Sequence, residues 1–457
     1  MASSLLHPYC WKLPRSVTDF LHLVLSSYIP SPSPSPSTLQ PPIYQQVTDE
    51  LQVHLDSHGQ YWWQTSGHLL AALLHDANYP PTSQHHILTF FGRTIAPYMG
   101  PAYSPGSPQW RSFMTDDHHP IELSWDWHTG RKPPTVRFSI EPVGLQAGTS
   151  LDPDNSHADA VFRKALLKAL PDTNMEWFHH FDRELAPTHQ GDGLMEGHPS
   201  KLFYAFDLTA KSITAKAYFF PGFKARETGQ TNLQVIADAI AKAPHCTPSS
   251  NQLRALHVFE DFVHDSSTPV LEMDMLAIDM EDPSTSRLKI YFRNRASSFA
   301  SVHQMMTLGG RITNPSMARG LQNLRRLWDA MLGQDGVPDD QPLLPAAEGS
   351  SNHRTAGLLY NVELPAGSTE PKVKIYIPVR HYAPSDERVM SAIHGYMESL
   401  DGNEKGLEYG YADTMKRLFR PGALQQRGLH TYVGCSVQAG GELRVVSYVN
   451  GQGEKMV

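Results

Sequence analysis

Short segments in which polar and apolar side chains alternate run through most of this sequence, and they constrain the fold more than any other feature. The clearest is residues 286–293, where Arg287, Lys289 and Tyr291 occupy alternate positions with apolar residues between them. Successive side chains of a β-strand point to opposite faces. The segment therefore predicts a strand with one cationic and aromatic face and one apolar face.

About ten such strands are expected, in antiparallel pairs joined by turns, with helices between the pairs. The expected strands are residues 121–127, 135–141, 202–208, 214–220, 270–279, 286–293, 358–364, 372–378, 429–437 and 442–449. The expected helices are residues 47–58, 66–76, 84–98, 157–170, 232–242, 252–263, 315–332 and 386–400.

Helices that all come from one side of a sheet must cover that side, and the apolar strand faces pack there. The polar faces then gather on the far side, which becomes a lumen if the sheet closes on itself. This interpretation gives an α+β fold in which solvent-exposed helices surround the barrel. The alternative is a flat sheet whose polar face is simply solvated.

The chain is expected to form a single domain over residues 1–457. Residues 1–25 have a short helical pattern. A Pro/Ser-rich loop is expected over 26–42, which contains the run SPSPSPS, and a flexible linker over 333–354.

Composition narrows the class of protein. The formal net charge of −8 argues against a general nucleic-acid binder. Three widely spaced cysteines favour neither a disulfide framework nor a structural zinc site. The first residues lack a signal-peptide pattern, and no apolar run has the length of a membrane span. We therefore expect a soluble, cytoplasmic protein.

Cations and tyrosines recur together on the polar strand faces. The pattern Lys-x-Tyr occurs three times, each time in the second strand of a pair, at Lys216–Tyr218, Lys289–Tyr291 and Lys374–Tyr376. Arg137 and Arg287 lie on such faces too. Clustered Lys and Arg in a confined space favour a multiply charged anion such as diphosphate. Tyrosine faces stabilise a neighbouring cation, so an anion that departs and leaves a carbocation would use both groups.

Glu122 is the candidate for holding a second substrate, because it lies on a polar face and can accept a hydrogen bond from an N–H or O–H group; a surface position is the alternative. The run from Asp116 to His119 is not expected to bind a metal, since adjacent residues of an extended chain point in opposite directions. The sequence also lacks a DDxxD cluster, a P-loop and a G-x-S-x-G elbow.

Taken together, these segments resemble the fungal dimethylallyltryptophan synthase (DMATS) type of aromatic prenyltransferase. The matching pieces, in family order, are TDDHHPIELSWDW, VRFSIEP, AKAYFFP, SRLKIYFR, TLGGR, KVKIYIPVRHY and LHTYVG. The resemblance implies the prenyltransferase (ABBA) barrel of ten antiparallel strands. It also implies alkaloid-type secondary metabolism, with transfer of a dimethylallyl group from its diphosphate to an aromatic ring, usually an indole, without a required metal or other cofactor.

The resemblance also implies roles for individual residues. Glu122 matches the glutamate that takes the indole N–H. Lys374 stands where the family often has Gln. The residues matching the diphosphate-binding cations are Arg137, Lys216, Arg287 and Lys289, and those matching the shielding tyrosines are Tyr218, Tyr291, Tyr376 and Tyr432.

The sequence leaves the acceptor open. A tyrosine, phenol or polyketide acceptor is one alternative, and a non-catalytic barrel that binds an anionic small molecule is another. The expected partners are small molecules, dimethylallyl diphosphate and an aromatic acceptor, and neither nucleic acid nor membrane; a homodimer is possible.

Overall fold

The computed structural model describes residues 41–104, 106–130, 132–187, 198–345, 353–400 and 410–451. The helical pattern of residues 1–25 lies outside these ranges, as do all but the last two residues of the Pro/Ser-rich loop and residues 346–352 of the expected linker. Residues from Leu39 onward form one compact unit.

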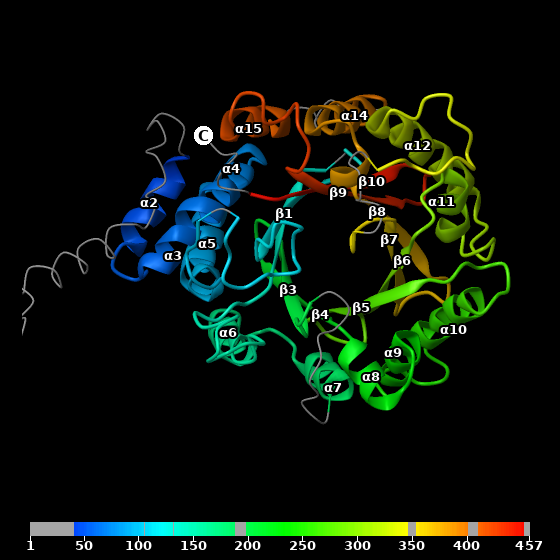
Figure 1. The fold of residues 1–457 in the computed structure, drawn as a ribbon, viewed down its shortest axis with the longest axis horizontal. Helices are drawn as coiled ribbons and strands as arrows, with labels where there is room; N and C mark the ends of the chain where they lie inside the picture. Colours follow the sequence, from blue (N-terminus) through cyan, green and yellow to red (C-terminus); the bar gives the residue numbers. More distant parts are fainter. Residues whose placement is uncertain are drawn as a thin grey trace, which may run out of the picture. The chain divides into compact units, whose positions relative to one another are not determined.

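Ten antiparallel strands form a closed barrel (Figure 1). Their order around the barrel is β1-β10-β9-β8-β7-β6-β5-β4-β3-β2, so each strand pairs with its neighbours in sequence and β1 closes the ring against β10. All ten expected strands are present. They are β1 (Ile121–His128), β2 (Thr135–Ile140), β3 (Leu202–Leu208), β4 (Ile213–Phe219), β5 (Glu272–Asp279), β6 (Arg287–Asn294), β7 (Leu358–Pro365), β8 (Lys372–Ile377), β9 (His430–Val437) and β10 (Leu443–Val449).

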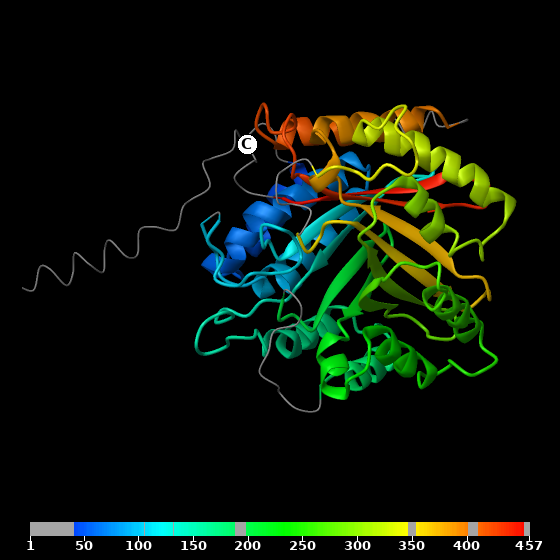
Figure 2. The same cartoon turned by 45° about the vertical axis from the view of Figure 1, so that its right-hand side comes forward.

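Helices surround the barrel on its outer face, as Figures 1 and 2 show from two directions. The α-helices are α2 (Pro42–Leu51), α3 (Ser57–Trp62), α4 (His68–Asp76), α5 (Pro81–Phe90), α6 (Ala158–Ala169), α7 (Glu176–Leu185), α8 (Gly222–Thr228), α9 (Asn232–Ala241), α10 (Asn251–Val263), α11 (Phe299–Met306), α12 (Pro315–Leu332), α13 (Val379–Tyr382), α14 (Asp386–Glu398) and α15 (Tyr411–Leu418). Two short π-helices, η1 (Trp63–Gly67) and η2 (Phe91–Ile95), and one 3-10 helix, η3 (Ala96–Tyr98), lie among the first α-helices. Among the described helices, none is both long and apolar enough to cross a bilayer.

The main hydrophobic core lies between the helices and the outer face of the barrel. On β6, Leu288, Ile290 and Phe292 are fully buried on that face, as the alternation predicts. Burying one such side chain stabilises the fold by about 1.5–3 kcal/mol. Burial of the apolar residues therefore determines which face of each strand points toward the helices. The polar faces are thereby directed into the lumen, and the flat-sheet alternative is wrong.

The helix predictions were less accurate than the strand predictions. The single helix expected over 47–58 is two helices, because α2 ends at Leu51 and the side chain of Asp56 caps α3 by accepting a hydrogen bond from the Gly59 amide. The sequence analysis missed five helices, α7, α8, α11, α13 and α15, most of them short.

Candidate active site

The polar lumen contains two successive layers of side chains. Residues two apart on a strand share a face and are separated by about 6.6 Å, so each Lys-x-Tyr pair contributes to both layers. The charged layer contains Lys216, Lys289 and Lys374, and the tyrosine layer contains Tyr218, Tyr291 and Tyr376.

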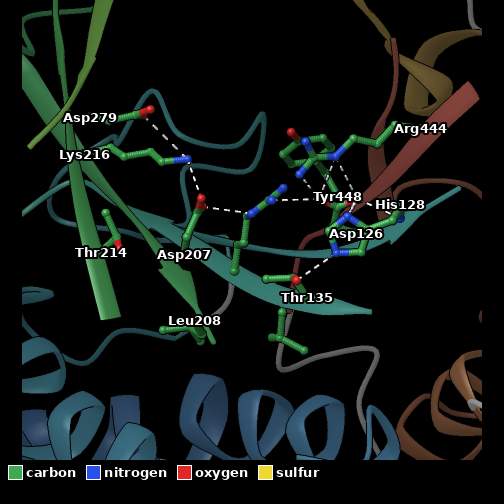
Figure 3. A network of polar contacts seen from close by, with 12 residues as sticks. Asp126, His128, Thr135, Asp207, Leu208, Thr214, Lys216, Asp279, Arg444 and Tyr448 are labelled. Carbon is green, nitrogen blue, oxygen red and sulfur yellow. Dashed lines mark hydrogen bonds and ion pairs between the residues drawn. The ribbon is translucent and has the colours of Figure 1, made fainter. Parts of the chain in front are cut away.

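In the charged layer, carboxylates on odd-numbered strands alternate with cations on even-numbered strands. Asp207 of β3 accepts a hydrogen bond from Lys216 of β4 at 2.6 Å and lies 2.8 Å from Nε of Arg137 on β2. Lys216 also lies 3.8 Å from Asp279 of β5, and Figure 3 shows it between the two carboxylates.

The alternation continues around the barrel. Asp279 contacts Lys289 at 2.7 Å and Arg287 at 2.9 Å, both on β6. Arg287 also donates to Glu363 of β7 at 2.9 Å. Asp279 and Glu363 thus hold both cations of β6, because Asp279 pairs with Lys289 and Arg287, and Glu363 pairs with Arg287.

Asp126 completes the charged layer where β1 meets β2 and β10. It lies 2.7 Å from Arg137 and also accepts from Arg444 of β10, whose side chain Figure 3 shows reaching it. Burial alone would raise the pKa of this carboxyl, but the attraction of the two arginines outweighs burial and holds the pKa well below its usual range.

Asp207 and Asp279 respond to burial and to neighbouring cations in the same way as Asp126. Burial opposes ionisation of Asp207, but Lys216 and Arg137 lower its pKa to about 2. The pKa of Asp279 is held still lower by Lys289, Lys216 and Arg287. These carboxylates are therefore ionised, and most of the cations are already neutralised before any ligand enters.

Lys374 is the exception, because among the described residues it forms no ion pair with a carboxylate. On the neighbouring strand β9 the residue opposite Lys374 is Ser436, which is not an acid. The lysine side chain lies over Gly434, where a Cβ would be 2.6 Å from Cε of Lys374. The ammonium donates to the Tyr448 hydroxyl at 3.1 Å and lies 4.4 Å from the centroid of the Tyr376 ring. Burial, the largest cause, and the charge of Arg137 together lower the pKa of Lys374 to about 7, and the attraction of Asp126 offsets only part of this fall.

The tyrosine layer is a continuous row of rings. Ring centroids are 5.7 Å apart between Tyr218 and Tyr291, 5.7 Å between Tyr291 and Tyr376, and 5.8 Å between Tyr376 and Tyr448. Phe203 extends the row by stacking on Tyr218 at 4.2 Å. Burial raises the pKa values of Tyr218, Tyr376 and Tyr448, so these three phenols remain neutral.

Glu122 lies on β1 beyond the tyrosine layer. Its Oε1 accepts a hydrogen bond from the hydroxyl of Thr431 at 2.5 Å, whereas Oε2 has no hydrogen-bond partner within the described ranges. Burial raises the pKa of Glu122 to about 8, and the charges of Asp116 and Asp117 add to that rise. Oε2 is therefore the atom that can hold a polar hydrogen of a second ligand.

A cavity opens above the tyrosine layer. Its lining combines aromatic and aliphatic side chains, here called the wall, with charged side chains near the strand ends and in the segments beyond them, here called the rim. The wall includes Phe113, Phe203, Phe220, Met275, Leu359, Glu122 and the tyrosines Tyr218, Tyr291, Tyr376, Tyr432 and Tyr448; the rim includes Asp116, Asp274, Arg293, Arg354, Arg380 and His381. A flat, partly polar molecule could lie over the tyrosines and reach Glu122.

Comparison with known proteins decides the family. The family model described as "Tryptophan dimethylallyltransferase" matches residues 58–412, most of the chain. The chain belongs to the tryptophan dimethylallyltransferase family. It is an aromatic prenyltransferase of the DMATS type, so the alternative of a non-catalytic barrel is wrong.

Two curated relatives illustrate the range of acceptors in the family. The "4-O-dimethylallyl-L-tyrosine synthase" of Claviceps purpurea is 33% identical over 402 residues, covering 86% of this chain and 88% of that protein. The "7-dimethylallyltryptophan synthase" of Aspergillus fumigatus is 30% identical over 448 residues, covering 93% of this chain and 88% of that protein.

Solved structures confirm the barrel fold. AnaPT from Neosartorya fischeri superposes with a TM-score of 0.76 at 24% identity, covering 91% of this chain and 99% of that one. NotF, crystallised with brevianamide F and DMSPP, superposes with a TM-score of 0.73 at 23% identity, covering 90% of this chain and 99% of that one. At these identities the likeness establishes the fold of this prenyltransferase and nothing finer.

The fold brings the sequence-predicted residues of this prenyltransferase into one lumen, in distinct places. Arg137, Lys216, Arg287 and Lys289 lie in the charged layer with carboxylate partners, and Lys374 lies there without one. The four predicted tyrosines line the cavity, with Tyr432 on the side of Glu122. The five cations do not line it, because the tyrosines lie between them and the opening.

Sequence reasoning missed the acidic half of the charged layer and two residues of β10. A usable signal was present, because β1, β3, β5 and β7 each carry a carboxylate near their ends, and each even-numbered strand carries a cation in its first half or at its middle. The missed residues are Asp126, Asp207, Asp279 and Glu363, together with Arg444 and Tyr448. Tyr448 follows its cation by four residues instead of two and so does not fit the Lys-x-Tyr pattern.

Proposed function

We propose that this prenyltransferase transfers a dimethylallyl group from dimethylallyl diphosphate to the ring of an indole compound, such as tryptophan or a Trp-containing cyclic dipeptide, without a required metal. The observation that carries the proposal is the order of the layers: cations, then a row of tyrosines, then a cavity with Glu122 on its wall. Each layer suits one stage of such a reaction.

The charged layer suits the diphosphate. Its oxygens would compete with Asp207 and Asp279 for Lys216, Lys289 and Arg287, and Lys374 would gain an anionic partner that the empty barrel does not give it. As the C–O bond breaks, both electrons leave with the diphosphate, and fixed cations stabilise this developing charge most strongly where water is excluded.

The tyrosine layer suits the allylic cation left behind. The ring faces of Tyr218, Tyr291 and Tyr376 offer negative quadrupoles to a carbocation, and their continuous packing keeps out water that would quench it to an alcohol. Because burial raises the pKa values of Tyr218 and Tyr376 and keeps these phenols neutral, their oxygens are poor nucleophiles and do not trap the cation themselves.

Glu122 suits the indole. Its Oε2 would accept the ring N–H, which places the ring over the tyrosines and increases the electron density of the ring carbons. A ring carbon attacks the allylic cation to form the C–C bond, and loss of the proton from that carbon to a base restores aromaticity.

A tyrosine or other phenol is the second candidate acceptor, and Glu122 itself favours it. With a pKa of about 8, its carboxylate is basic enough to remove a phenol proton as the oxygen attacks, which forms a C–O bond and leaves no ring proton to be lost. The C. purpurea relative is named for prenylation of a tyrosine oxygen.

The test is turnover of dimethylallyl diphosphate with tryptophan, several Trp-containing cyclic dipeptides and tyrosine, each in excess chelator, with diphosphate release measured and products located by NMR. We expect an indole product and full activity in chelator. Turnover of tyrosine alone would favour the second candidate, and loss of all activity in chelator would contradict a metal-free reaction. Glu122→Ala should reduce indole turnover more than diphosphate release by hydrolysis.

A further inference from the structure

Four polar side chains from three separate segments meet at the rim of the cavity. Asp116 precedes β1, His353 and Thr355 precede β7, and His381 lies in α13. Nε2 of His381 lies 3.3 Å from a carboxylate oxygen of Asp116, and the imidazole rings of the two histidines have centroids 5.1 Å apart. None of these groups takes part in the proposed transfer.

The hydroxyl of Thr355 occupies the centre of this cluster. Its Oγ1 lies 2.6 Å from Nε2 of His381, 2.9 Å from Nδ1 of His353, and 3.0 and 3.2 Å from the two oxygens of Asp116. Nδ1 of His353 also accepts a hydrogen bond from the backbone N–H of Thr355 at 3.2 Å. The hydroxyl has a single proton, so it can donate to only one of its three neighbours at a time. The three surrounding groups therefore converge on one point in space.

We propose that Asp116, His353 and His381 form a binding site for a single transition-metal dication of the zinc class. Two imidazoles and a carboxylate are the donor set that Zn²⁺ and Co²⁺ take in proteins, whereas Mg²⁺ prefers oxygen donors alone. The three ligand atoms already lie within 4.8 Å of one another. Tetrahedral bonds of about 2.0 Å require separations of about 3.3 Å, so the Asp116–His381 pair is in place and His353 must approach as the hydroxyl swings out.

The local charges permit this site but limit its affinity. A carboxylate oxygen of Asp116 already lies 3.3 Å from Nε2 of His381, so the two ligands face the same point. Arg380 lies 3.5 Å from the same carboxylate and repels a metal cation. His353 is exposed, which gives the ion a route from solvent.

A bound ion would tie together three segments at the mouth of the cavity. Asp116, Thr355 and His381 all line that cavity. Joining Asp116 and His381 to His353 through one ion narrows the entrance, so the metal should slow entry of the acceptor. This effect on turnover rests on the proposed function, whereas the binding of the metal does not.

The first test is titration of the full chain with Co²⁺, followed by its visible absorption, with Zn²⁺ as the competitor and Mg²⁺ as the oxygen-preferring control. We expect a tetrahedral Co²⁺ band that Zn²⁺ removes and Mg²⁺ leaves unchanged. His353→Gln and His381→Gln should each weaken Co²⁺ binding at least about tenfold. Loss of a residue that only orients a metal ligand already lowers metal affinity by about tenfold or more, and loss of the ligand itself should lower it by at least as much. His394→Gln, at an exposed histidine on α14 paired with Glu398, is the matched control and should bind as the native chain does.

Thr355→Ala separates a metal site from a purely structural cluster. It removes the hydroxyl that competes for the centre, so metal binding should tighten, whereas loss of a structural hydrogen bond would only loosen the rim. Absence of the Co²⁺ band, or a band equal in His353→Gln and His394→Gln, would overturn the site. In turnover assays Zn²⁺ should raise KM for the acceptor in the native chain and not in His353→Gln; binding without this change would overturn the effect on entry alone.

Discussion

The two lysines Lys216 and Lys374 belong to the same sequence pattern, yet their replacement by glutamine should change stability in opposite directions. Lys216 neutralises Asp207 at 2.6 Å, whereas Lys374 has a tyrosine hydroxyl and two ring faces in place of a carboxylate. Lys374→Gln therefore removes a buried positive charge that has no carboxylate partner. Lys216→Gln instead leaves the negative charge of Asp207 without one of its cations.

The magnitude for Lys374 follows from its pKa. Burial lowers this pKa from 10.5 to about 7, and each pH unit corresponds to about 1.36 kcal/mol, so keeping the charge costs the folded protein at most about 5 kcal/mol at pH 6. Between pH 7 and 10.5 the unfolded chain binds the proton and the folded chain does not. The loss of stability caused by the Lys374 charge therefore has its full value below pH 7. It falls as pH rises and is about 2 kcal/mol at pH 9.

Removing Lys216 should instead destabilise the chain by about 3–5 kcal/mol, the usual cost of leaving one partner of a buried ion pair alone. Asp207 would keep only Arg137, and Asp279 would lose one of its three cations. This loss should be similar at pH 6 and pH 9, because the carboxylates are ionised at both.

Urea unfolding followed by tryptophan fluorescence at pH 6 and pH 9 measures both effects. We expect Lys374→Gln to raise the free energy of unfolding, more at pH 6 than at pH 9, and Lys216→Gln to lower it at both. Inorganic diphosphate should stabilise both variants less than the native chain. A Lys374→Gln protein less stable than the native chain at pH 6 would refute the reasoning from the missing carboxylate.

Four further outcomes are expected. The native kcat/KM should rise with pH up to about 8 as Glu122 ionises, and Glu122→Gln should be slower and lack that rise in a pH profile. Tyr376→Phe keeps the ring and loses only its hydrogen bonds to Tyr291 and Asn361, so it should change turnover little, whereas Tyr376→Ala should increase the share of dimethylallyl alcohol seen by chromatography. Asp279→Asn should lower the urea midpoint of the empty protein yet tighten diphosphate binding in calorimetry, because that carboxylate competes with the ligand for its cations. Calorimetry in buffers of different ionisation enthalpy should detect proton uptake when diphosphate binds near pH 8.

Sequence alone could predict the barrel, because alternation is a local property and each apolar face has only the helices to pack against. On β6, burial of Leu288, Ile290 and Phe292 determines the outward face. The alternate residues Arg287 and Lys289 must then point into the lumen. What alternation could not give is which groups meet across the lumen.

The pairing of Arg137 with Asp207 depends on the register of β2 against β3, which places the two residues directly opposite each other. The approach of Asp116 to His381 depends on the paths of the segments outside the strands. Asp116 illustrates the limit. Its neighbours in sequence, His118 and His119, look like the obvious metal ligands, and the cluster instead draws its histidines from positions more than two hundred residues away.

The charged layer also explains how such a lumen can fold while empty. Six cations face four carboxylates within the described part of the layer, which leaves a formal surplus of two charges. The cations are Arg137, Lys216, Arg287, Lys289, Lys374 and Arg444, and the carboxylates are Asp126, Asp207, Asp279 and Glu363. Burial lowers the pKa of Lys289 to about 8 and that of Lys374 to about 7, so these two side chains can release the surplus as protons. The empty layer then approaches neutrality, and an entering diphosphate restores the two charges as it binds. The carboxylates neutralise four of the cations, and Lys289 and Lys374 can lose their protons. The layer therefore avoids the mutual repulsion that cations alone would cause in a closed lumen.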